Sequence, residues 1–174
     1  VDTPIMPLTI ALAAEASFVA RSVDTHTEHL QGTLERAGRH KGSSFVEVLQ
    51  NCNIFNDGAW RDFTDREVRE DRMLVLEHGK PMIFGKDRNR GIRLAGLHPE
   101  VVTIGENGVT EADLLVHDER AEEPYLALML SRMQWPAFPV PVGVFRALPR
   151  PTHDELITSQ IDVAIAKSGK GDLA

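Results

Sequence analysis

The sequence contains almost no cysteine. Of its 174 residues, only Cys52 carries a thiol, so a framework of internal disulfides is excluded. A single free thiol suits a reducing compartment, and we expect a cytoplasmic protein. One cysteine also cannot hold an iron–sulfur cluster or a structural zinc ion by itself, because such centres need about four ligands. If Cys52 binds a metal, its partner ligands lie outside this chain.

Long apolar runs and an excess of basic charge are also missing. No stretch approaches the ~20 apolar residues that a membrane-spanning helix needs, and no basic segment with a signal-peptide core opens the chain. The formal net charge is −7, whereas nucleic-acid-binding domains are usually basic. We therefore expect no membrane and no nucleic acid among the partners. The 42% of hydrophobic residues is enough for a domain with a real core.

Strand and helix patterns alternate along the first part of the chain, which predicts an α/β fold. Pro7 suits the first turn of a helix, and residues 18–20 and 44–50 have the apolar, β-branched character of buried strands. Between these strands, residues 25–28 have the spacing of a capping box that opens a helix. A strand, a helix and a second strand predict a parallel crossover unit. The apolar face of that helix would consist of Leu30, Leu34 and Ala37.

After residue 58 the composition changes, because residues 61–72 are almost entirely charged. We place a boundary there and predict two parts, residues 1–58 and residues 59–174. In the second part, residues 92–96 and 101–104 could pair as strands across the turn at 97–100.

Three further elements follow in the second part. Pro124 would stand in the first turn of a helix with Leu126, Met129, Leu130 and Met133. Three prolines predict an extended loop over residues 135–141. A capping box at residues 152–155 predicts a last helix. The side chains of that helix expected to face inward are Leu156, Ile157, Ile161, Ala164 and Ile165.

Cys52 is the first candidate site residue, because it follows the strand predicted at residues 44–50. In open α/β sheets, ligands bind beyond the carboxyl ends of the strands, and a thiolate is a soft metal ligand. The alternative is a buried cysteine that packs as a small hydrophobe, since free cysteine is among the most buried residue types. Position alone favours this core interpretation and leaves both open.

Two other groups of side chains are candidates for chemistry. His26 and His29 share one face of the predicted helix and are compatible with a metal site, although they supply only half of the usual zinc ligands. A solvated first turn is the favoured alternative. Lys86, Arg88, Arg90 and Arg93 form a basic cluster that would attract an acidic electron carrier or a coenzyme A phosphate. An ordinary charged turn is the simpler interpretation.

Four blocks of the sequence resemble, in order, the β subunits of 2-oxoacid:ferredoxin oxidoreductases. The central block runs from His40-Lys41-Gly42 through the apolar strand to Cys52 and Asp57-Gly58, with Asn53 where that family usually has proline. The upstream block carries Glu15 in place of the usual glycine. The four blocks are residues 12–21, residues 40–58, residues 78–85 with 91–92, and residues 143–146.

The resemblance implies that this chain is the C-terminal half of such a subunit. Residues 1–58 would be the last part of a three-layer α/β domain that binds thiamine diphosphate, and residues 59–174 a smaller α/β extension. Cys52 would be the fourth ligand of a [4Fe-4S] cluster. The cofactors implied are thiamine diphosphate with Mg²⁺ and the cluster, with coenzyme A as co-substrate. The N-terminal half would hold the other cluster ligands and the catalytic residues.

The implied reaction is the oxidative decarboxylation of 2-oxoglutarate to succinyl-CoA, with electrons passing through the cluster to ferredoxin. The implied partners are the N-terminal half, an α subunit and ferredoxin, in an (αβ)₂ assembly. Pyruvate or a broad range of 2-oxoacids stays open as the substrate. Two other functions also stay open: a non-catalytic α/β interaction module with a buried, inert Cys52, and a metal hydrolase built on His26 and His29.

Overall fold

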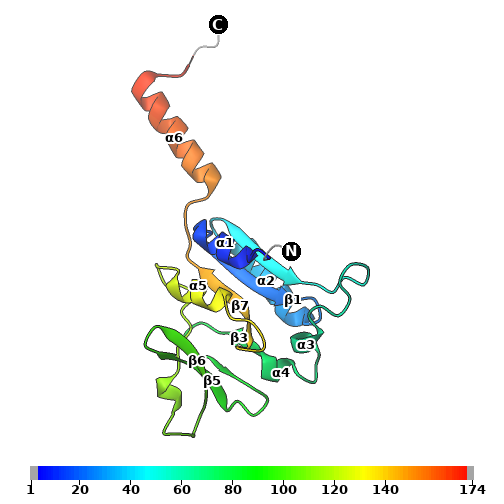
Figure 1. The fold of residues 1–174 in the computed structure, drawn as a ribbon. Helices are drawn as coiled ribbons and strands as arrows, with labels where there is room; N and C mark the ends of the chain where they lie inside the picture. The colour runs from blue at the N-terminus through cyan, green and yellow to red at the C-terminus, as the bar shows by residue number, and fades with distance from the viewer. Residues whose placement is uncertain (1–3, 172–174) are drawn as a thin grey trace.

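The computed structural model describes residues 4–171 and divides its strands between two sheets (Figure 1). The larger sheet has four strands in the order β2-β1-β7-β3, and the smaller one has three in the order β4-β5-β6. The α/β class predicted from the sequence is confirmed. The strands are β1 (Phe18–Val23), β2 (Ser44–Leu49), β3 (Met73–Leu76), β4 (Ile83–Phe84), β5 (Arg90–Ala95), β6 (His98–Thr103) and β7 (Val140–Ala147). The helices are α1 (Pro7–Ala13), α2 (Thr27–Arg39), α3 (Arg61–Thr64), α4 (Arg69–Arg72), the 3₁₀ helix η1 (Glu111–Asp113), α5 (Tyr125–Ser131) and α6 (His153–Ser168).

The predicted parallel crossover is present as β1, α2 and β2. β1 is buried at every position because it lies between β2 and β7 in the sheet, and it pairs with β2 in parallel from Phe18 and Ser44 onward. The capping box predicted at Thr25 is wrong: His26 is the N-cap and no side chain caps the helix. A hydroxyl side chain accepts the first helical N–H groups only from the N-cap position. Thr25 lies one residue before the N-cap, so its hydroxyl does not cap the helix.

The face of α2 that was predicted to be buried is only partly correct. Leu34 is 49% exposed, whereas Thr33 is buried. Ala37 packs against the small cluster around Phe18. The face toward the sheet is therefore rotated from Leu34 to Thr33, which a polarity pattern alone does not show.

β7 joins the two parts of the chain in one sheet. It pairs antiparallel with β1 and parallel with β3, so the sheet contains two strands from residues 1–58 and two from residues 59–174. Gly143 has φ +113 where β7 passes β3, and a Cβ atom there would lie 3.0 Å from the carbonyl oxygen of Leu76. The division at residue 58 and the thiamine diphosphate-binding fold stay predictions.

The main core lies between the large sheet and helices α1 and α5. Leu8 and Leu12 of α1 and Leu130 of α5 have no exposed surface, and they cluster with Val19 of β1 and Phe145 of β7. Burial of this apolar surface is the principal force that fixes the two helices on the sheet. The predicted start of α1 at Pro7 is confirmed.

The smaller sheet is built around the predicted hairpin. β5 and β6 are antiparallel, and Ala95 pairs with His98. The turn is thus two residues long, tighter than predicted from the sequence, and Gly96 supplies the positive φ of +65 that it needs. Ile92 of β5 is fully buried in the main core, which attaches this sheet to the rest of the fold.

The proline-rich segment before β7 is shorter than predicted. Residues 135–139 lie outside the strands, but Val140 and Pro141 already belong to β7. At Pro141, β7 pairs only with Leu74 of β3, because its ladder with β1 covers Gly143 to Ala147. A proline can occupy such a position, since a missing N–H is tolerated where one side of the strand is unpaired.

The last helix forms as predicted but does not pack inward. Thr152 and Glu155 make the expected capping box at the start of α6. The expectation that one face is buried is wrong, because every residue of α6 is exposed and the helix extends away from the two sheets (Figure 1). Its side chains find no opposing element in residues 4–171. The large apolar side chains exposed on α6 are Leu156, Ile157, Ile161, Val163 and Ile165.

None of the helices within residues 4–171 is both long enough and apolar enough to span a lipid bilayer.

Candidate functional site

Cys52 lies in a loop directly after β2, at the carboxyl edge of the strand, as predicted. Its thiol is exposed, so the interpretation of Cys52 as a buried core residue is wrong. The reason is that the chain leaves the sheet after Leu49 and folds back on itself, with Cys52 and Asn56 forming an isolated bridge. The backbone N–H of Asn56 donates to the carbonyl oxygen of Cys52 at 3.0 Å.

Asn51 fixes the shape of this loop. Its side-chain amide donates to Oδ1 of Asp57 at 2.9 Å, and its own Oδ1 accepts the backbone N–H of Gly58 at 2.8 Å. The backbone N–H of Asn51 also donates to Oδ2 of Asp24, which follows β1, at 3.2 Å. The cysteine loop is therefore closed on itself and tied to the neighbouring strand.

The backbone around Cys52 favours the thiolate. The N–H groups of Phe55 and Ile54 hold the pKa of the Cys52 thiol below its ordinary value. A thiolate is the form that binds a metal ion. The loop thus presents an exposed sulfur whose negative charge is stabilised by backbone donors.

Ile54 and Phe55 form an apolar tip beside the thiol. They are 85% and 90% exposed, respectively, although both side chains are large and apolar. Large apolar side chains that are exposed together are a candidate surface for contact with another polypeptide. The sequence analysis did not identify this tip, because an apolar pair in a short loop has no helix or strand period.

His26 and His29 do not form a metal-binding pair. Their rings are stacked, with centroids 5.2 Å apart, and Nδ1 of His29 is engaged with the hydroxyl of Ser22 at 2.7 Å. Burial lowers the pKa of both imidazoles, with a further contribution from Arg69 at His26 and from His26 at His29. No group of three or more metal-ligating side chains gathers within residues 4–171, so the geometry gives no support to a histidine-based hydrolase.

The predicted basic cluster is divided in the structure. Arg90 pairs with Asp71 and Arg93 pairs with Glu100, both at 2.5 Å. These two guanidinium groups are therefore neutralised locally. Lys86 and Arg88 have no ion-pair partner in the described part of the chain.

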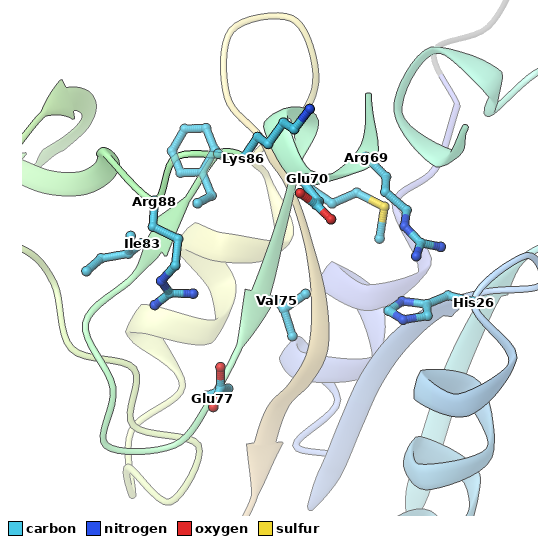
Figure 2. Close-up of a pocket in the computed structure, with 11 residues that line it drawn as sticks. His26, Arg69, Glu70, Val75, Glu77, Ile83, Lys86 and Arg88 are labelled. Carbon is cyan, nitrogen blue, oxygen red and sulfur yellow. The ribbon is translucent and has the colours of Figure 1, made fainter. Parts of the chain in front are cut away.

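Lys86 and Arg88 instead line a cavity together with His26. In this cavity, His26 and Arg88 lie on opposite sides of β3 (Figure 2). The cavity has a volume of about 390 Å³. Val75 of β3 points into it, and Arg69 approaches from the side of His26 (Figure 2). The structure thus brings two groups of candidates from the sequence into one cavity. Arg69, Glu70 and Glu77 complete its charged lining and were not identified from the sequence. Arg69 and Glu70 belong to the charged run at residues 61–72, and Glu77 directly follows β3.

Comparison with known proteins shows where this arrangement belongs. No protein-family model matches the chain. The 2-oxoglutarate oxidoreductase subunit KorB of Mycobacterium tuberculosis is 35% identical over 174 residues, which cover 99% of this chain and 46% of that protein.

Two other β subunits match shorter stretches. The 2-oxoacid:ferredoxin oxidoreductase subunit beta of Saccharolobus solfataricus is 31% identical over 68 residues, which are 39% of this chain and 22% of that protein. Subunit beta of the 2-oxoacid:ferredoxin oxidoreductase 1 of Aeropyrum pernix is 37% identical over 71 residues, 41% of this chain and 21% of that protein.

The proteins to which the chain is similar are oxidoreductase subunits. The chain is similar to a 2-oxoglutarate oxidoreductase subunit over nearly its whole length, and to β subunits of 2-oxoacid:ferredoxin oxidoreductases over shorter stretches. It spans about half the length of the curated relative that it matches throughout. The resemblance inferred from the four sequence blocks is confirmed.

Proposed function

We propose that this chain is the C-terminal half of the β subunit of a 2-oxoglutarate:ferredoxin oxidoreductase. The observation that carries the proposal is the similarity to a 2-oxoglutarate oxidoreductase subunit over 99% of the chain. The reaction would convert 2-oxoglutarate and coenzyme A to succinyl-CoA and carbon dioxide, with ferredoxin as the electron acceptor. Supporting this role, Cys52 lies exposed at the carboxyl edge of a parallel strand pair, where α/β enzymes bind their ligands.

In this proposal, Cys52 is one ligand of a [4Fe-4S] cluster. The site fits that role, because the sulfur is exposed and nearby backbone N–H groups favour its thiolate. Hydrogen bonds to cluster sulfurs also tune a reduction potential. The other cysteine ligands must come from outside this chain, which contains only one cysteine. The apolar tip at Ile54 and Phe55 would pack against the polypeptide that brings them.

The remaining cofactors would be held by other parts of the complex. Thiamine diphosphate and Mg²⁺ would bind in the N-terminal half, and the α subunit would complete an (αβ)₂ assembly in the cytoplasm. Thiamine diphosphate supplies the electron sink that decarboxylation of a 2-oxoacid requires. In this chain, the Asn51 hydrogen bonds would hold the Cys52 sulfur in place and orient the loop toward its partner.

The preferred substrate is the least supported part of the proposal. The relative that matches nearly all of the chain carries 2-oxoglutarate in its name, whereas the two relatives that match shorter stretches are named for 2-oxoacids in general. Comparing the rates of ferredoxin reduction with 2-oxoglutarate, pyruvate and a branched-chain 2-oxoacid decides between a specific and a broad enzyme. A rate with pyruvate equal to or above that with 2-oxoglutarate overturns the assignment of 2-oxoglutarate.

The test of the function is spectroscopic and uses the natively purified complex that contains this chain. Visible absorption and electron paramagnetic resonance are recorded anaerobically before and after addition of 2-oxoglutarate and coenzyme A. We expect a brown protein whose cluster signal appears or grows when the substrates reduce it. A colourless complex under anaerobic handling contradicts the proposal and favours an interaction module without catalysis.

The ligand role of Cys52 needs its own test in the same complex. Cys52→Ser removes the thiolate, and Asn56→Ser changes a neighbouring exposed side chain as the control. We expect Cys52→Ser to lose or alter the cluster signal, and Asn56→Ser to retain it. A normal signal in Cys52→Ser contradicts the ligand assignment while leaving the oxidoreductase function untouched.

A further inference from the structure

A second cavity opens at the sheet edge opposite Cys52. Its volume is about 600 Å³, within the range of small-molecule sites. The strand ends around it are in register, because Phe18 at the start of β1 lies opposite Ser44 of β2 and Ala147 of β7. Phe18, Ala147 and Pro149 supply apolar surface to the cavity.

The charged lining of this cavity is strongly one-sided. Four cationic side chains line it against one carboxylate, that of Glu119, although the whole chain carries a net charge of −7. The cationic residues come from separate segments: the end of α2, the turn before β2, and the loop before α5. Basic residues in the last turn of a helix have an electrostatic benefit of their own, but this does not apply to the other segments. The four residues are Arg36, Arg39, Lys41 and Arg120.

One of these cations is held firmly and the others are available. Nη2 of Arg36 donates to Oε1 of the buried Glu119 at 2.6 Å. Arg39 and Lys41 contact Glu35 and Glu155 only through exposed ion pairs of 3.5 and 3.3 Å, which are weak in water. Within residues 4–171, Arg120 has no carboxylate at ion-pairing distance.

The turn that carries Lys41 is rigidly positioned. Nε2 of His40 lies 3.0 Å from the hydroxyl of Ser17, and that hydroxyl also accepts the backbone N–H of Ser43 at 2.9 Å. Gly42 has φ +124, and a Cβ atom there would lie 2.2 Å from Oγ of Ser17. The residues His40 to Gly42 therefore have a structural task at this cavity, away from the cysteine loop at the other end of β2.

From this lining we infer that the cavity binds a small molecule through a phosphate group. Guanidinium groups match phosphate oxygens with paired hydrogen bonds, and Arg39 and Arg120 converge here from two segments of the chain. The apolar surface at Ala147 and Pro149 can pack against an organic portion of a phosphate ester.

Equilibrium dialysis of the full chain against labelled inorganic pyrophosphate, at fixed ionic strength, tests the inference. The cavity variant is Arg39→Gln with Arg120→Gln. The control is Arg66→Gln with Arg132→Gln, which removes the same charge from exposed arginines outside the cavity. We expect saturable binding that weakens by at least about tenfold in the cavity variant, because each arginine loses charge-assisted hydrogen bonds, and that stays unchanged in the control.

Three results overturn the inference: no saturable binding, unchanged binding in the cavity variant, or equal weakening in both variants, which indicates a general charge effect. The four arginines replaced in the two variants are exposed, so thermal melting should show both variants folded. These residues are Arg39, Arg120, Arg66 and Arg132. A parallel titration with adenosine diphosphate identifies the source of the phosphate. Tighter binding than pyrophosphate indicates a phosphate ester, and equal or weaker binding indicates an inorganic ion. None of these measurements depends on the iron–sulfur proposal.

Discussion

Glu15 and Arg146 lie 131 residues apart in the chain and meet in an ion pair, in which Nη1 of Arg146 donates to Oε2 of Glu15 at 2.8 Å. Arg146 is almost fully buried, and its other Nη donates to the carbonyl oxygen of Glu122. Glu15 has φ +59, a conformation that favours glycine. Glu15 therefore pairs its carboxylate with a buried arginine while its backbone adopts a conformation that favours glycine.

Replacing this carboxylate should change how stability depends on pH. Arg146 holds the pKa of Glu15 below its ordinary value, so the pair stabilises the fold above the unfolded pKa of ~4.3 and loses this contribution as the pH falls through the lower, folded pKa. We expect Glu15→Gln to be less stable than the wild type near neutral pH, and the difference to shrink in acid.

Urea unfolding at a neutral and an acidic pH measures this difference. Glu106→Gln is the control, because Glu106 is exposed and has no ion pair in the described part of the chain. A difference between Glu15→Gln and wild type that stays constant across the acidic range is incompatible with the pair as described.

The thiol of Cys52 should react at an unusually low pH when no metal is bound. The N–H groups of Phe55 and Ile54 lower its pKa, so the thiolate is present below the ~8.5 of an ordinary free thiol. The rate of alkylation by iodoacetamide, followed against pH, should have its midpoint below that value. A midpoint at or above that of a small free thiol means that the loop does not stabilise the thiolate.

Asn51→Ala should loosen the cysteine loop with little effect on the rest of the fold. The substitution removes side-chain hydrogen bonds to Asp57 and Gly58, each worth about 1 kcal/mol at most at an exposed site. We expect faster amide hydrogen exchange at Gly58 and nearly unchanged exchange in β1. Gln160→Ala, which truncates an exposed amide side chain in α6, is the control. Unchanged protection of Gly58 would show that the loop holds its shape without Asn51.

Two glycine substitutions should change stability in opposite directions. At Gly143, φ is +113 and an added Cβ meets the carbonyl oxygen of Leu76 at 3.0 Å, so Gly143→Ala should destabilise the protein by roughly 1–3 kcal/mol. Gly32 lies in α2 with open space around it, so Gly32→Ala should stabilise by roughly 0.5–1 kcal/mol. Denaturant unfolding measures both, and the same sign for the two variants contradicts the backbone argument.

Removing the chain from residue 152 onward should leave the stability of the remainder unchanged. All of α6 is exposed, and its side-chain link to the sheets is the exposed pair of Lys41 with Glu155. An isolated helix of this length is marginal in water, so its amides should exchange quickly in the full chain. A clear drop in melting temperature on truncation, or slow exchange in α6, would show that the helix packs against protein in solution.

Local patterns in the sequence predict a good part of this fold. The crossover from β1 to β2 is predictable because two apolar strands flank a helix of the right length, and the capping box of α6 has its own signature at Thr152 and Glu155. The insertion of β7 between β1 and β3 depends on pairing between segments more than 60 residues apart. No local period encodes such a pairing.

The candidate site, like the fold, was only partly predictable from local sequence patterns. The position of Cys52 after β2 follows from the strand pattern, but its exposure depends on the path of the loop, which Asn51 closes through hydrogen bonds. Likewise, Arg36 and Glu119 are unremarkable charges in the sequence, and only the fold brings them to 2.6 Å. The inward face predicted for α6 failed for the opposite reason, since a pattern of apolar residues does not say whether a partner surface lies within the chain.

The two sites proposed for this chain lie at opposite ends of strand β2. Its six residues run from the turn with Lys41 to the loop with Cys52, and six residues of extended chain span about 20 Å. The basic cavity and the cysteine loop are therefore separate sites at opposite ends of the same strand. Occupancy at one end of the strand and redox state at the other can be measured on the same molecule as two separate signals.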